Sequence, residues 1–352
     1  MKGKAMKAMI MSAGKGTRVR PLSYDVPKPM FTVANKPILS YTLDLLKKHG
    51  IRDAMINLGP HSMAIKEYFA DGLKYAMNID YSFEKVLLAT AGSIKKVEKY
   101  FDDTFIVMSG DGLTDIDLTG AVKFHRAKKA LATIVLSKVE SRFEYGIVQM
   151  NKDCSVKEFI EKPSWGEVFC DTVNTGIYIL EPEIMDYIPK NKMYDFGMQL
   201  WAQLLRKKQK IYGYEMNSYW CDIGNLDEYR KAQKDVLSGN IKVNLAGEKK
   251  GSGIWIGSNT RIEKGSSIKG SCIIGKNCII KKNANIEGIN VIGDGSVIDE
   301  NASIVDSILW SSARINKGVK IKNCIVSSGV TVSDNTCILE KAIIRKNERR
   351  KN

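Results

Sequence analysis

The first 240 residues alternate between two patterns of apolar and polar positions. Short apolar runs, typical of buried β-strands, are separated by longer runs in which apolar residues return every three or four positions, as on one face of an amphipathic helix. The strand-like runs are 8–11, 54–58, 79–83, 105–108, 132–136 and 173–180, and the helix-like runs are 37–49, 62–70, 91–100, 118–129, 198–207 and 225–238. This alternation predicts an α/β fold with a Rossmann-like, mostly parallel sheet and helices on both faces. Pro37 fits the first turn of its helix, and Gly50 fits the end of that helix.

After residue 239 the pattern changes to a six-residue period. Isoleucines stand at every sixth position, with Gly, Asn, Ser and Cys between them: Ile256, Ile262, Ile268, Ile274, Ile280, Ile286, Ile292, Ile298 and Ile304. Such hexapeptide repeats predict a left-handed parallel β-helix in which each isoleucine points into a three-sided coil. The alternative is an ordinary sandwich with fortuitous spacing. The period slips by one residue at Leu309 and again at Val326, and we interpret the slips near Trp310 and Cys324 as shortened corners or bulges that leave the coil intact.

The change of period divides the chain into two predicted domains, residues 1–240 and 241–352. A chain of 352 residues exceeds the size at which a single hydrophobic core stops growing, so two domains are also expected from length alone. The six-residue period extends to Ile344. The chain then ends in a short basic tail, "KNERRKN", which is typical of a solvated segment.

Composition narrows the classes of partner. The formal net charge of +15 fits nucleic acid, an anionic membrane or small acidic ligands such as phosphorylated metabolites. Much of this excess lies beyond residue 240, but no interleaved aromatics or nucleic-acid-binding motif accompany it, so we expect no nucleic acid partner. The seven cysteines are odd in number and form no C-x-x-C pair, which disfavours disulfides and zinc. Because no apolar run has the length of a membrane span and residues 1–7 lack the core of a signal peptide, we expect a cytoplasmic protein with no membrane partner.

A basic segment, "MSAGKGTRVRPLSYDVPKP" (residues 11–29), follows the first predicted strand. Its lysine precedes the second glycine, which excludes a Walker A loop, and Val19 stands where a dinucleotide fingerprint needs a third glycine. A third arrangement fits better. Backbone amides beside the glycines form an anion nest, Arg18 and Lys28 reach into it, and three prolines hold the loop extended. Since ligands of such sheets bind beyond the carboxyl ends of the strands, we interpret the segment as a phosphate-binding loop.

Six further motifs follow in order: "TAGS" (90–93), "SGDGLTDIDL" (109–118), "YGIV" (145–148), "EKP" (161–163), "VNTGIY" (173–178) and "YWCDIG" (219–224). Together with the basic segment they closely resemble the signature of sugar-1-phosphate nucleotidyltransferases, also called nucleoside-diphosphate-sugar pyrophosphorylases. With the β-helix behind them, the resemblance covers essentially the whole chain. It is greatest to bacterial mannose-1-phosphate guanylyltransferases and their glucose-1-phosphate relatives.

The resemblance implies that a phosphate oxygen of a sugar 1-phosphate attacks the α-phosphorus of a nucleoside triphosphate and releases pyrophosphate. The nucleophile is already an anion, so the protein has to align two polyanions and offset their charge rather than supply a base. By resemblance, Arg18, Lys28 and Lys162 are catalytic. The nucleotide-binding residues that it implies are Ala13, Gly14, Gly16, Thr17, Arg18, Lys28, Gly92 and Asp111. For Arg18 and Lys28 the alternative is a solvated basic turn.

Two aspartates are candidate metal ligands. Asp111 comes just after the apolar run "TFIVM", and Asp222 lies in a short stretch that Gly224 turns, so both can reach the ligand edge of the sheet. Two converging carboxylates suit Mg²⁺, and in the family these two positions are the metal ligands. Taken singly, each aspartate would instead be a turn residue or a helix cap.

On the sugar side, the resemblance places Lys162 on the phosphate of the sugar 1-phosphate and Glu161 near the sugar hydroxyls. Gly146 and Asn174 would line the sugar, because glycine lets the ring approach the backbone and an amide both donates and accepts hydrogen bonds. The alternatives are an exposed edge-strand lysine, a turn glycine and a strand-end amide.

The segment near the base departs from the family. Gly92 would lie near the nucleotide base, although Thr90 can instead cap the following helix. The family's Pro-Leu-Gly-Thr-Ala-Gly stretch is here part of "EKVLLATAGS", with Leu87 and Ala89 in place of the proline and the first glycine. Because this segment faces the base, the departure bears on the nucleotide more than on the chemistry.

We therefore expect a Mg²⁺-dependent nucleotidyltransferase that converts GTP and mannose 1-phosphate into GDP-mannose and pyrophosphate. The alternatives are a glucose-1-phosphate adenylyl-, thymidylyl- or uridylyltransferase and a catalytically silent regulatory subunit. A silent subunit is disfavoured because the chain has all five predicted catalytic and metal-binding residues: Arg18, Lys28, Asp111, Lys162 and Asp222.

The predicted β-helix is also compatible with an acyltransferase. Many hexapeptide β-helices belong to acyltransferases that use a histidine of the coil as base, but this chain has only His49, His61 and His125, all in the first predicted domain. We therefore expect the β-helix to serve homo-oligomerisation or regulation rather than catalysis.

Overall fold

The structure is a computed structural model that describes residues 5–139, 144–164, 167–168 and 170–343. The chain forms two compact units. The first consists of Met1–Lys15, Pro27–Met30 and Ile38–Asp222, and the second of Gly16–Val26, Phe31–Pro37 and Ile223–Asn352. The chain therefore passes between the units several times within its first forty residues. The domain boundary at residue 240, drawn from the change of period, stays a prediction.

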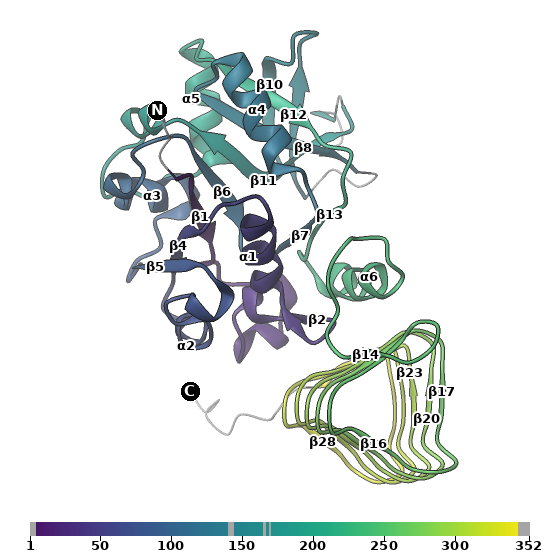
Figure 1. Ribbon diagram of the computed structural model, residues 1–352. Coiled ribbons are helices and arrows are strands. Elements are labelled where there is room, and N and C mark those ends of the chain that lie inside the picture. Colours follow the sequence, from purple (N-terminus) through teal and green to yellow (C-terminus); the bar gives the residue numbers. More distant parts are fainter. Residues whose placement is uncertain (1–4, 140–143, 165–166, 169, 344–352) are drawn as a thin grey trace. The chain divides into compact units, whose positions relative to one another are not determined.

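The first unit is built on a nine-stranded sheet (Figure 1). The strand order is β10-β9-β11-β6-β1-β4-β5, with β8 paired to β11 and β12 paired to β8. The strands are β1 (Lys7–Met11), β4 (Asp53–Leu58), β5 (Asn78–Phe83), β6 (Phe105–Ser109), β8 (Ala132–Lys138), β9 (Gly146–Met150), β10 (Val156–Glu161), β11 (Thr172–Leu180) and β12 (Ile211–Glu215). Strands β5, β4, β1 and β6 are parallel, as predicted, whereas β11 runs antiparallel to β6, β8 and β9. The sheet is therefore mixed. A small antiparallel pair, β7 (Gly112–Thr114) with β13 (Trp220–Asp222), stands apart from it.

Helices cover both faces of this sheet, as the alternation predicts. In β1, Ala8 and Ile10 pack in one apolar core with α1 (Ile38–Lys48), α2 (Met63–Phe69) and α4 (Leu118–Lys128). Met9 points to the other core, which contains α3 (Ala89–Lys96) and α5 (Trp201–Arg206). Within the described residues no helix combines the length and the apolar character that crossing a membrane requires.

Some predicted helices differ at their ends. The helix predicted from Pro37 begins one residue later, because Pro37 is still paired with Thr32 in a two-stranded ribbon of β2 (Thr32–Val33) and β3 (Lys36–Pro37). Gly50 follows the helix end in a left-handed conformation, as predicted. The runs 91–100 and 198–207 each divide into two helical pieces. Outside the basic segment, the further helical pieces among the described residues are the 3₁₀ turns η4 (Leu73–Tyr75), η5 (Glu98–Tyr100) and η7 (Pro182–Tyr187) and the π-helix η8 (Phe196–Leu200).

The second unit is dominated by a three-sided parallel β-helix (Figure 1). One side holds the parallel strands β15 (Ile254–Ile256), β18 (Cys272–Ile274), β21 (Asn290–Ile292), β24 (Ile308–Leu309), β27 (Ile325–Val326) and β30 (Ala342–Ile343), and β14 (Glu248–Lys249) pairs antiparallel with β15 at its edge. The second holds β16 (Arg261–Ile262), β19 (Ile279–Ile280), β22 (Val297–Ile298), β25 (Arg314–Ile315) and β28 (Thr331–Val332). The third holds β17 (Ser267–Lys269), β20 (Asn285–Glu287), β23 (Ser303–Val305), β26 (Lys320–Lys322) and β29 (Cys337–Leu339). Helix α6 (Leu226–Leu237), capped by Asn225, precedes the coil.

The periodic side chains fill the coil. Ile286 pairs with Ile304, and Ile304 pairs with Ile321, so the coil shortens by one residue at the first slip without losing register. This confirms the interpretation of the slips as shortened corners. The periodic positions from 274 to 332 are buried, whereas Ile262 in the first coil is 40% exposed because no further coil covers it. Ile344 and the basic tail lie outside the described residues.

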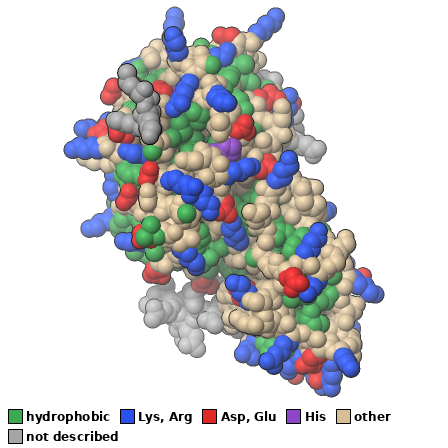
Figure 2. Space-filling view, in the orientation of Figure 1, with side chains coloured by type: hydrophobic (Ala, Val, Ile, Leu, Met, Phe, Trp, Pro, Cys, Tyr) green, Lys and Arg blue, Asp and Glu red, His purple; other side chains and the backbone are tan. Residues whose placement is uncertain are grey.

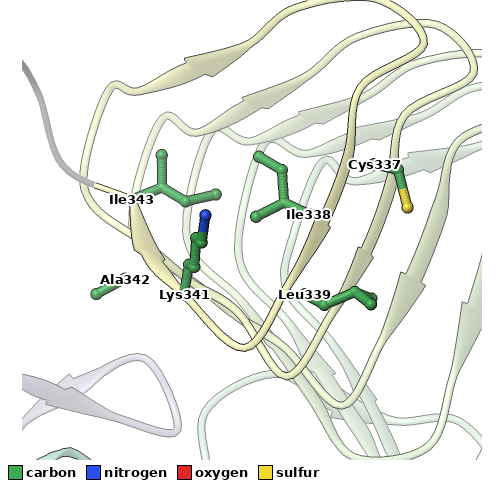
Figure 3. A pocket seen from close by; sticks show the side chains of 6 residues that line it. All are labelled: Cys337, Ile338, Leu339, Lys341, Ala342 and Ile343. Atoms are coloured by element: carbon green, nitrogen blue, oxygen red, sulfur yellow. The ribbon is translucent and has the colours of Figure 1, made fainter.

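The last described coil has a hollow on its outer side (Figure 3). Six residues from β29, β30 and the turn between them line it: Cys337, Ile338, Leu339, Lys341, Ala342 and Ile343. The end of the β-helix therefore presents apolar side chains.

Candidate active site

Three parallel strands bring their carboxyl ends together at one edge of the sheet. The amide of Ser12, after β1, donates to Asn57 Oδ1 in β4 at 2.6 Å, and the amide of Gly110, after β6, donates to the carbonyl of Met11 at 2.9 Å. A Cβ at Gly110 would overlap Ser12 Oγ, so glycine is required for this approach. Asp111 and the start of the basic segment are thereby held at the ligand edge, as the sequence predicts.

An ammonium group joins the two predicted metal ligands. Lys28 Nζ lies 2.7 Å from Asp111 Oδ2 and 3.3 Å from Asp222 Oδ1. Asp222 reaches this position because β13 pairs with β7, which places Asp222 opposite Gly112. The side chains of Lys28, Asp111 and Asp222 are 9%, 23% and 20% exposed, so the cluster is largely shielded from water.

Lys28 and Asp111 shift each other's pKa as an ion pair should. Burial lowers the pKa of Lys28, but the charges and hydrogen bonds of Asp111 and Asp222 outweigh burial and raise it above 10.5. Burial likewise raises the pKa of Asp111, but the Lys28 ammonium and the Ser109 hydroxyl outweigh burial and bring it below 3.8. Both groups are therefore charged at neutral pH.

The donor set fits magnesium. Within the described ranges, no group of three or more His, Cys, Asp or Glu side chains lies together as a metal cluster would, so Asp111 and Asp222 are a pair of carboxylates. Mg²⁺ binds proteins through one or two carboxylates and fills its other positions with water and substrate phosphates. A structural zinc site, by contrast, needs four ligands.

The basic segment is not extended as expected. It forms three 3₁₀ turns, η1 (Thr17–Val19), η2 (Leu22–Tyr24) and η3 (Lys28–Met30), closed by bonds such as Met30 N to Pro27 O at 2.8 Å. Its prolines do not prevent this, because a residue without an amide proton is tolerated at the start of a helical turn. Gly16 is left-handed with φ 58°, and the surroundings of Gly14 are open.

The predicted nucleotide residues divide between the two units. Ala13 and Gly14 lie in the first unit with Lys28 and Asp111, whereas Gly16, Thr17 and Arg18 lie in the second. Arg18 and Thr17 are exposed. Across the face drawn in Figure 2, Lys and Arg side chains are interspersed with Asp and Glu.

Glu161 ends β10 with its carboxylate beside two glycines. A Cβ at Gly146 would lie 2.7 Å from Glu161 Oε2, and a Cβ at Gly197 would overlap the same oxygen. Burial raises the pKa of Glu161, and the nearby Asp195 carboxylate raises it further, while Lys162 partly offsets both. Gly146 thus has a packing reason to be glycine, and its contact with a sugar stays a prediction.

Lys162 stands in an unusual backbone conformation. Its φ is 49°, in the left-handed region, and its amide donates to the carbonyl of Tyr145 at 3.3 Å while the side chain is exposed. A non-glycine residue in this region costs on the order of 1–2 kcal/mol, and such strain gathers at ligand-binding sites. The Tyr145 ring lies 5.2 Å from the ring of Trp220, which comes two residues before Asp222. The predicted sugar-phosphate residue and the carboxylate pair are therefore linked by packing.

Asn174 and Gly92 have internal partners. Asn174 Nδ2 donates to the Tyr178 hydroxyl at 2.9 Å, and Asn174 Oδ1 accepts from the amide of Gly176 at 3.0 Å. A Cβ at Gly92 would lie 2.6 Å from the carbonyl of Lys192, so Gly92 lets α3 pack closely on that segment. These contacts leave the predicted ligand roles of Asn174 and Gly92 untested.

Asp195 is a residue that the sequence analysis missed. Its Oδ1 accepts from the amides of Gly197 and Met198, and its Oδ2 accepts from the hydroxyl of Thr90 at 2.7 Å. Thr90 therefore does not cap α3, which begins at Ala89, but ties α3 to the start of η8. No motif marks Asp195. The one local signal is that an aspartate two residues before Gly197 can cap the start of a helix.

Comparisons with known proteins give family matches for both parts of the chain. A family model described as Nucleotidyl transferase matches residues 7–239, and one described as GMPPB C-terminal domain matches residues 252–351. The chain is 41% identical over 269 residues to a UTP–glucose-1-phosphate uridylyltransferase from Synechocystis sp., with 72% of this chain and 69% of that protein covered. It is 34% identical over 242 residues to a mannose-1-phosphate guanyltransferase from Yarrowia lipolytica, with 66% and 63% covered. The match therefore spans about two thirds of the length of these curated relatives.

A solved structure gives a further likeness. HddC from Yersinia pseudotuberculosis, complexed with GMP-PN, matches with a TM-score of 0.57 at 25% identity. The match covers 66% of this chain and 99% of that one.

Proposed function

The chain belongs to the nucleotidyl transferase family, and on this premise we propose that it transfers a nucleotidyl group from GTP to mannose 1-phosphate in the presence of Mg²⁺. A phosphate oxygen of the sugar 1-phosphate attacks the α-phosphorus, and the bond from that phosphorus to the oxygen bridging to the β-phosphate breaks. Pyrophosphate leaves with the electron pair, and GDP-mannose remains. The observation that carries the proposal is the Lys28 ammonium held between Asp111 and Asp222 at the ligand edge of the sheet.

Each side chain has a task that suits its chemistry. Asp111 and Asp222 would hold Mg²⁺, which would supply positive charge to offset that of the phosphates. Lys28 contributes a positive charge fixed beside the carboxylates, and Arg18 offers a planar fork of donors to the triphosphate. Lys162 would bind the phosphate of the sugar 1-phosphate, and Glu161 would accept hydrogen bonds from the sugar hydroxyls.

The reaction requires no general base, because the attacking oxygen is already an anion. The rate then depends on aligning two polyanions and on neutralising the charge that develops between them. This requirement explains why the candidate residues are two carboxylates and several cations rather than a histidine and its partner.

GTP and mannose 1-phosphate are favoured by two of the named proteins. The Yarrowia relative is a mannose-1-phosphate guanyltransferase, and HddC was solved with GMP-PN. A second pair, UTP and glucose 1-phosphate, is favoured by the Synechocystis uridylyltransferase, because identity to it is 41% against 34%.

Pyrophosphate release tests the proposal with GTP, ATP, UTP and dTTP, each combined with mannose, glucose and N-acetylglucosamine 1-phosphates. We expect the highest kcat/KM for GTP with mannose 1-phosphate; a maximum at UTP with glucose 1-phosphate would support the second pair instead. Asp222→Asn tests the role of the carboxylate, since it keeps the size of the side chain and removes its charge, and we expect a loss of at least about 100-fold in kcat/KM. A folded protein that is silent toward every pair at millimolar Mg²⁺ would be a regulatory subunit, contrary to the proposal.

We also propose that the protein acts in the cytoplasm as a homo-oligomer joined through the β-helix. The apolar side chains at the ends of the coil support this. Ile262 in the first coil is 40% exposed, and Leu339 in the last described coil, drawn in Figure 3, is 58% exposed. Sedimentation velocity of the full chain at micromolar concentration tests the assembly. A single monomeric species would contradict it.

A further inference from the structure

A cluster of aromatic side chains joins three segments of the second unit. Trp310, at the first shortened corner of the β-helix, is only 4% exposed. Its Nε1 donates to the hydroxyl of Tyr229 in α6 at 2.8 Å. The Phe31 ring, just before β2, lies 5.1 Å from the Trp310 ring and 5.6 Å from the Tyr229 ring. The β-helix, α6 and the β2–β3 ribbon are thereby packed together.

Hydrogen bonds fix the ribbon on both neighbours. The carbonyl of Thr32 accepts from the Tyr229 hydroxyl and from Gln233 Nε2, each at 2.6 Å. The amide of Ala34 donates to Gln233 Oε1 at 2.8 Å, and Asn35 Nδ2 donates to the carbonyl of Ile292 in the coil at 2.8 Å. Tyr229 and Gln233 are 0% and 2% exposed, so these bonds are shielded from water and costly to leave unmade.

The ribbon and α6 both continue directly into the carboxylate cluster. Phe31 follows Met30, the last residue of the η3 turn that begins with Lys28, and the chain passes from the first unit to the second at this bond. The last of the passages between the units lies between Asp222 and Ile223, and Asn225, the cap of α6, comes three residues after Asp222. Lys28 and Asp222 belong to separate segments of the cluster. Lys28 comes two residues before one crossing into the second unit, and Asp222 comes directly before another.

We propose that the β-helix sets the geometry of the metal-binding cluster through this contact, with Trp310 and Tyr229 as positioning residues for Lys28 and Asp222. An anchored ribbon fixes where Lys28 enters the cluster, and an anchored α6 fixes where Asp222 leaves it. The β-helix is then part of the catalytic apparatus as well as an assembly element. The dependence of turnover on Mg²⁺, which is one test of this coupling, rests on the proposed function. Amide hydrogen exchange and Mn²⁺ affinity, which are the other tests, can be measured without it.

Tyr229→Phe and Trp310→Phe test this coupling, because both keep an aromatic ring and remove one hydrogen-bonding group. The control is Tyr81→Phe, which removes a phenol bond to the carbonyl of Ala70 at 2.7 Å within the first unit. For the two test variants we expect faster amide exchange in peptides covering residues 26–38. We also expect apparent half-saturation by Mg²⁺ to rise about 3- to 10-fold, as loss of one buried hydrogen bond allows, with the KM for sugar 1-phosphate unchanged.

The outcomes separate coupling from a merely structural role. If exchange and Mg²⁺ dependence match the control, or if only the melting temperature falls, the coupling is refuted. If the wild-type chain is inactive with every substrate pair, the proposed function fails, and Mn²⁺ affinity measured by electron paramagnetic resonance replaces the Mg²⁺ readout. If Tyr229→Phe does not fold, Trp310→Phe, which leaves the Tyr229 bond to Thr32 in place, decides the question.

Discussion

Replacing Lys28 with methionine removes the ammonium from the carboxylate cluster while keeping most of its buried aliphatic chain. At an effective dielectric constant of about 20, unit charges at 2.7 and 3.3 Å attract by about 6 and about 5 kcal/mol, respectively. Desolvation of the ammonium cancels much of this attraction, and breaking a buried ion pair costs about 3–5 kcal/mol in practice. Since Asp111 and Asp222 retain 23% and 20% exposure, we expect Lys28→Met to lower the free energy of unfolding by about 3 kcal/mol at neutral pH.

The loss should depend on pH in a definite direction. In the wild type, the pKa of Asp111 is lowered below 3.8, so its contribution to stability is present above that pH and is lost as pH falls. The pKa of Lys28 is raised above 10.5, so its contribution is present below that pH and is lost only as pH rises further. In the variant, Asp111 keeps its burial without the ammonium, so its pKa rises and the charged form is destabilised. The difference between wild type and variant is therefore smallest near pH 4 and grows toward pH 7.

Urea unfolding followed by circular dichroism at 222 nm measures this difference, because α1 to α5 all lie in the first unit. The control is Lys47→Met, since Lys47 forms an exposed helix-surface pair with Asp44 at 3.4 Å. Such pairs contribute less than about 1 kcal/mol, and the control should show little pH dependence. A Lys28→Met loss that stays below about 1 kcal/mol, or that is constant from pH 4.5 to 7.5, would refute the reasoning.

Three further outcomes are expected. Millimolar Mg²⁺ should raise the melting temperature of Lys28→Met more than that of the wild type, because the vacated carboxylates can bind the cation; equal shifts would contradict this. Ala89→Gly should stabilise the chain by about 0.5–1 kcal/mol in thermal melts, since Ala89 has φ 57° and relief of left-handed strain exceeds the flexibility of glycine. Gly197→Ala should raise the KM for the sugar 1-phosphate about 10-fold by displacing Glu161, with the KM for the nucleotide nearly unchanged, and the reverse pattern would remove Glu161 from the sugar site.

The β-helix could be predicted from the sequence because the six-residue spacing of the isoleucines is also the spacing of the side chains that pack inside the coil. Each sixth residue enters the coil, so the isoleucines at 286 and 304 pair directly in neighbouring turns. The slip at Leu309 is likewise visible in the sequence as one missing residue. The family, predicted from motif order, is confirmed by the match over residues 7–239.

The contacts around the cluster could not be read in this way. The sequence places Asp111 and Asp222 at the ligand edge of the sheet, and the resemblance makes both metal ligands, but no local pattern shows how they meet. They lie 111 positions apart, and the pairing of β7 with β13 brings them together. The bond from Tyr229 to Thr32 spans 197 positions, and no local pattern marks either end. The turns in the basic segment were missed for a different reason: its prolines occupy positions that a 3₁₀ turn accepts.

Ala89 stands where the family has a glycine, in the segment expected to face the nucleotide base. The backbone of this segment is held independently of the altered side chain, because the amide of Leu88 donates to the buried Glu84 carboxylate at 3.0 Å and the amide of Tyr194 donates to the carbonyl of Leu88 at 2.9 Å. Asn57 anchors Glu84 in turn through a 3.0 Å bond. The alanine therefore adds strain without changing the path of the chain. It follows that Ala89→Gly should alter stability and leave the preferred nucleotide unchanged, so that the choice of base depends on side chains around α3 rather than on the missing glycine.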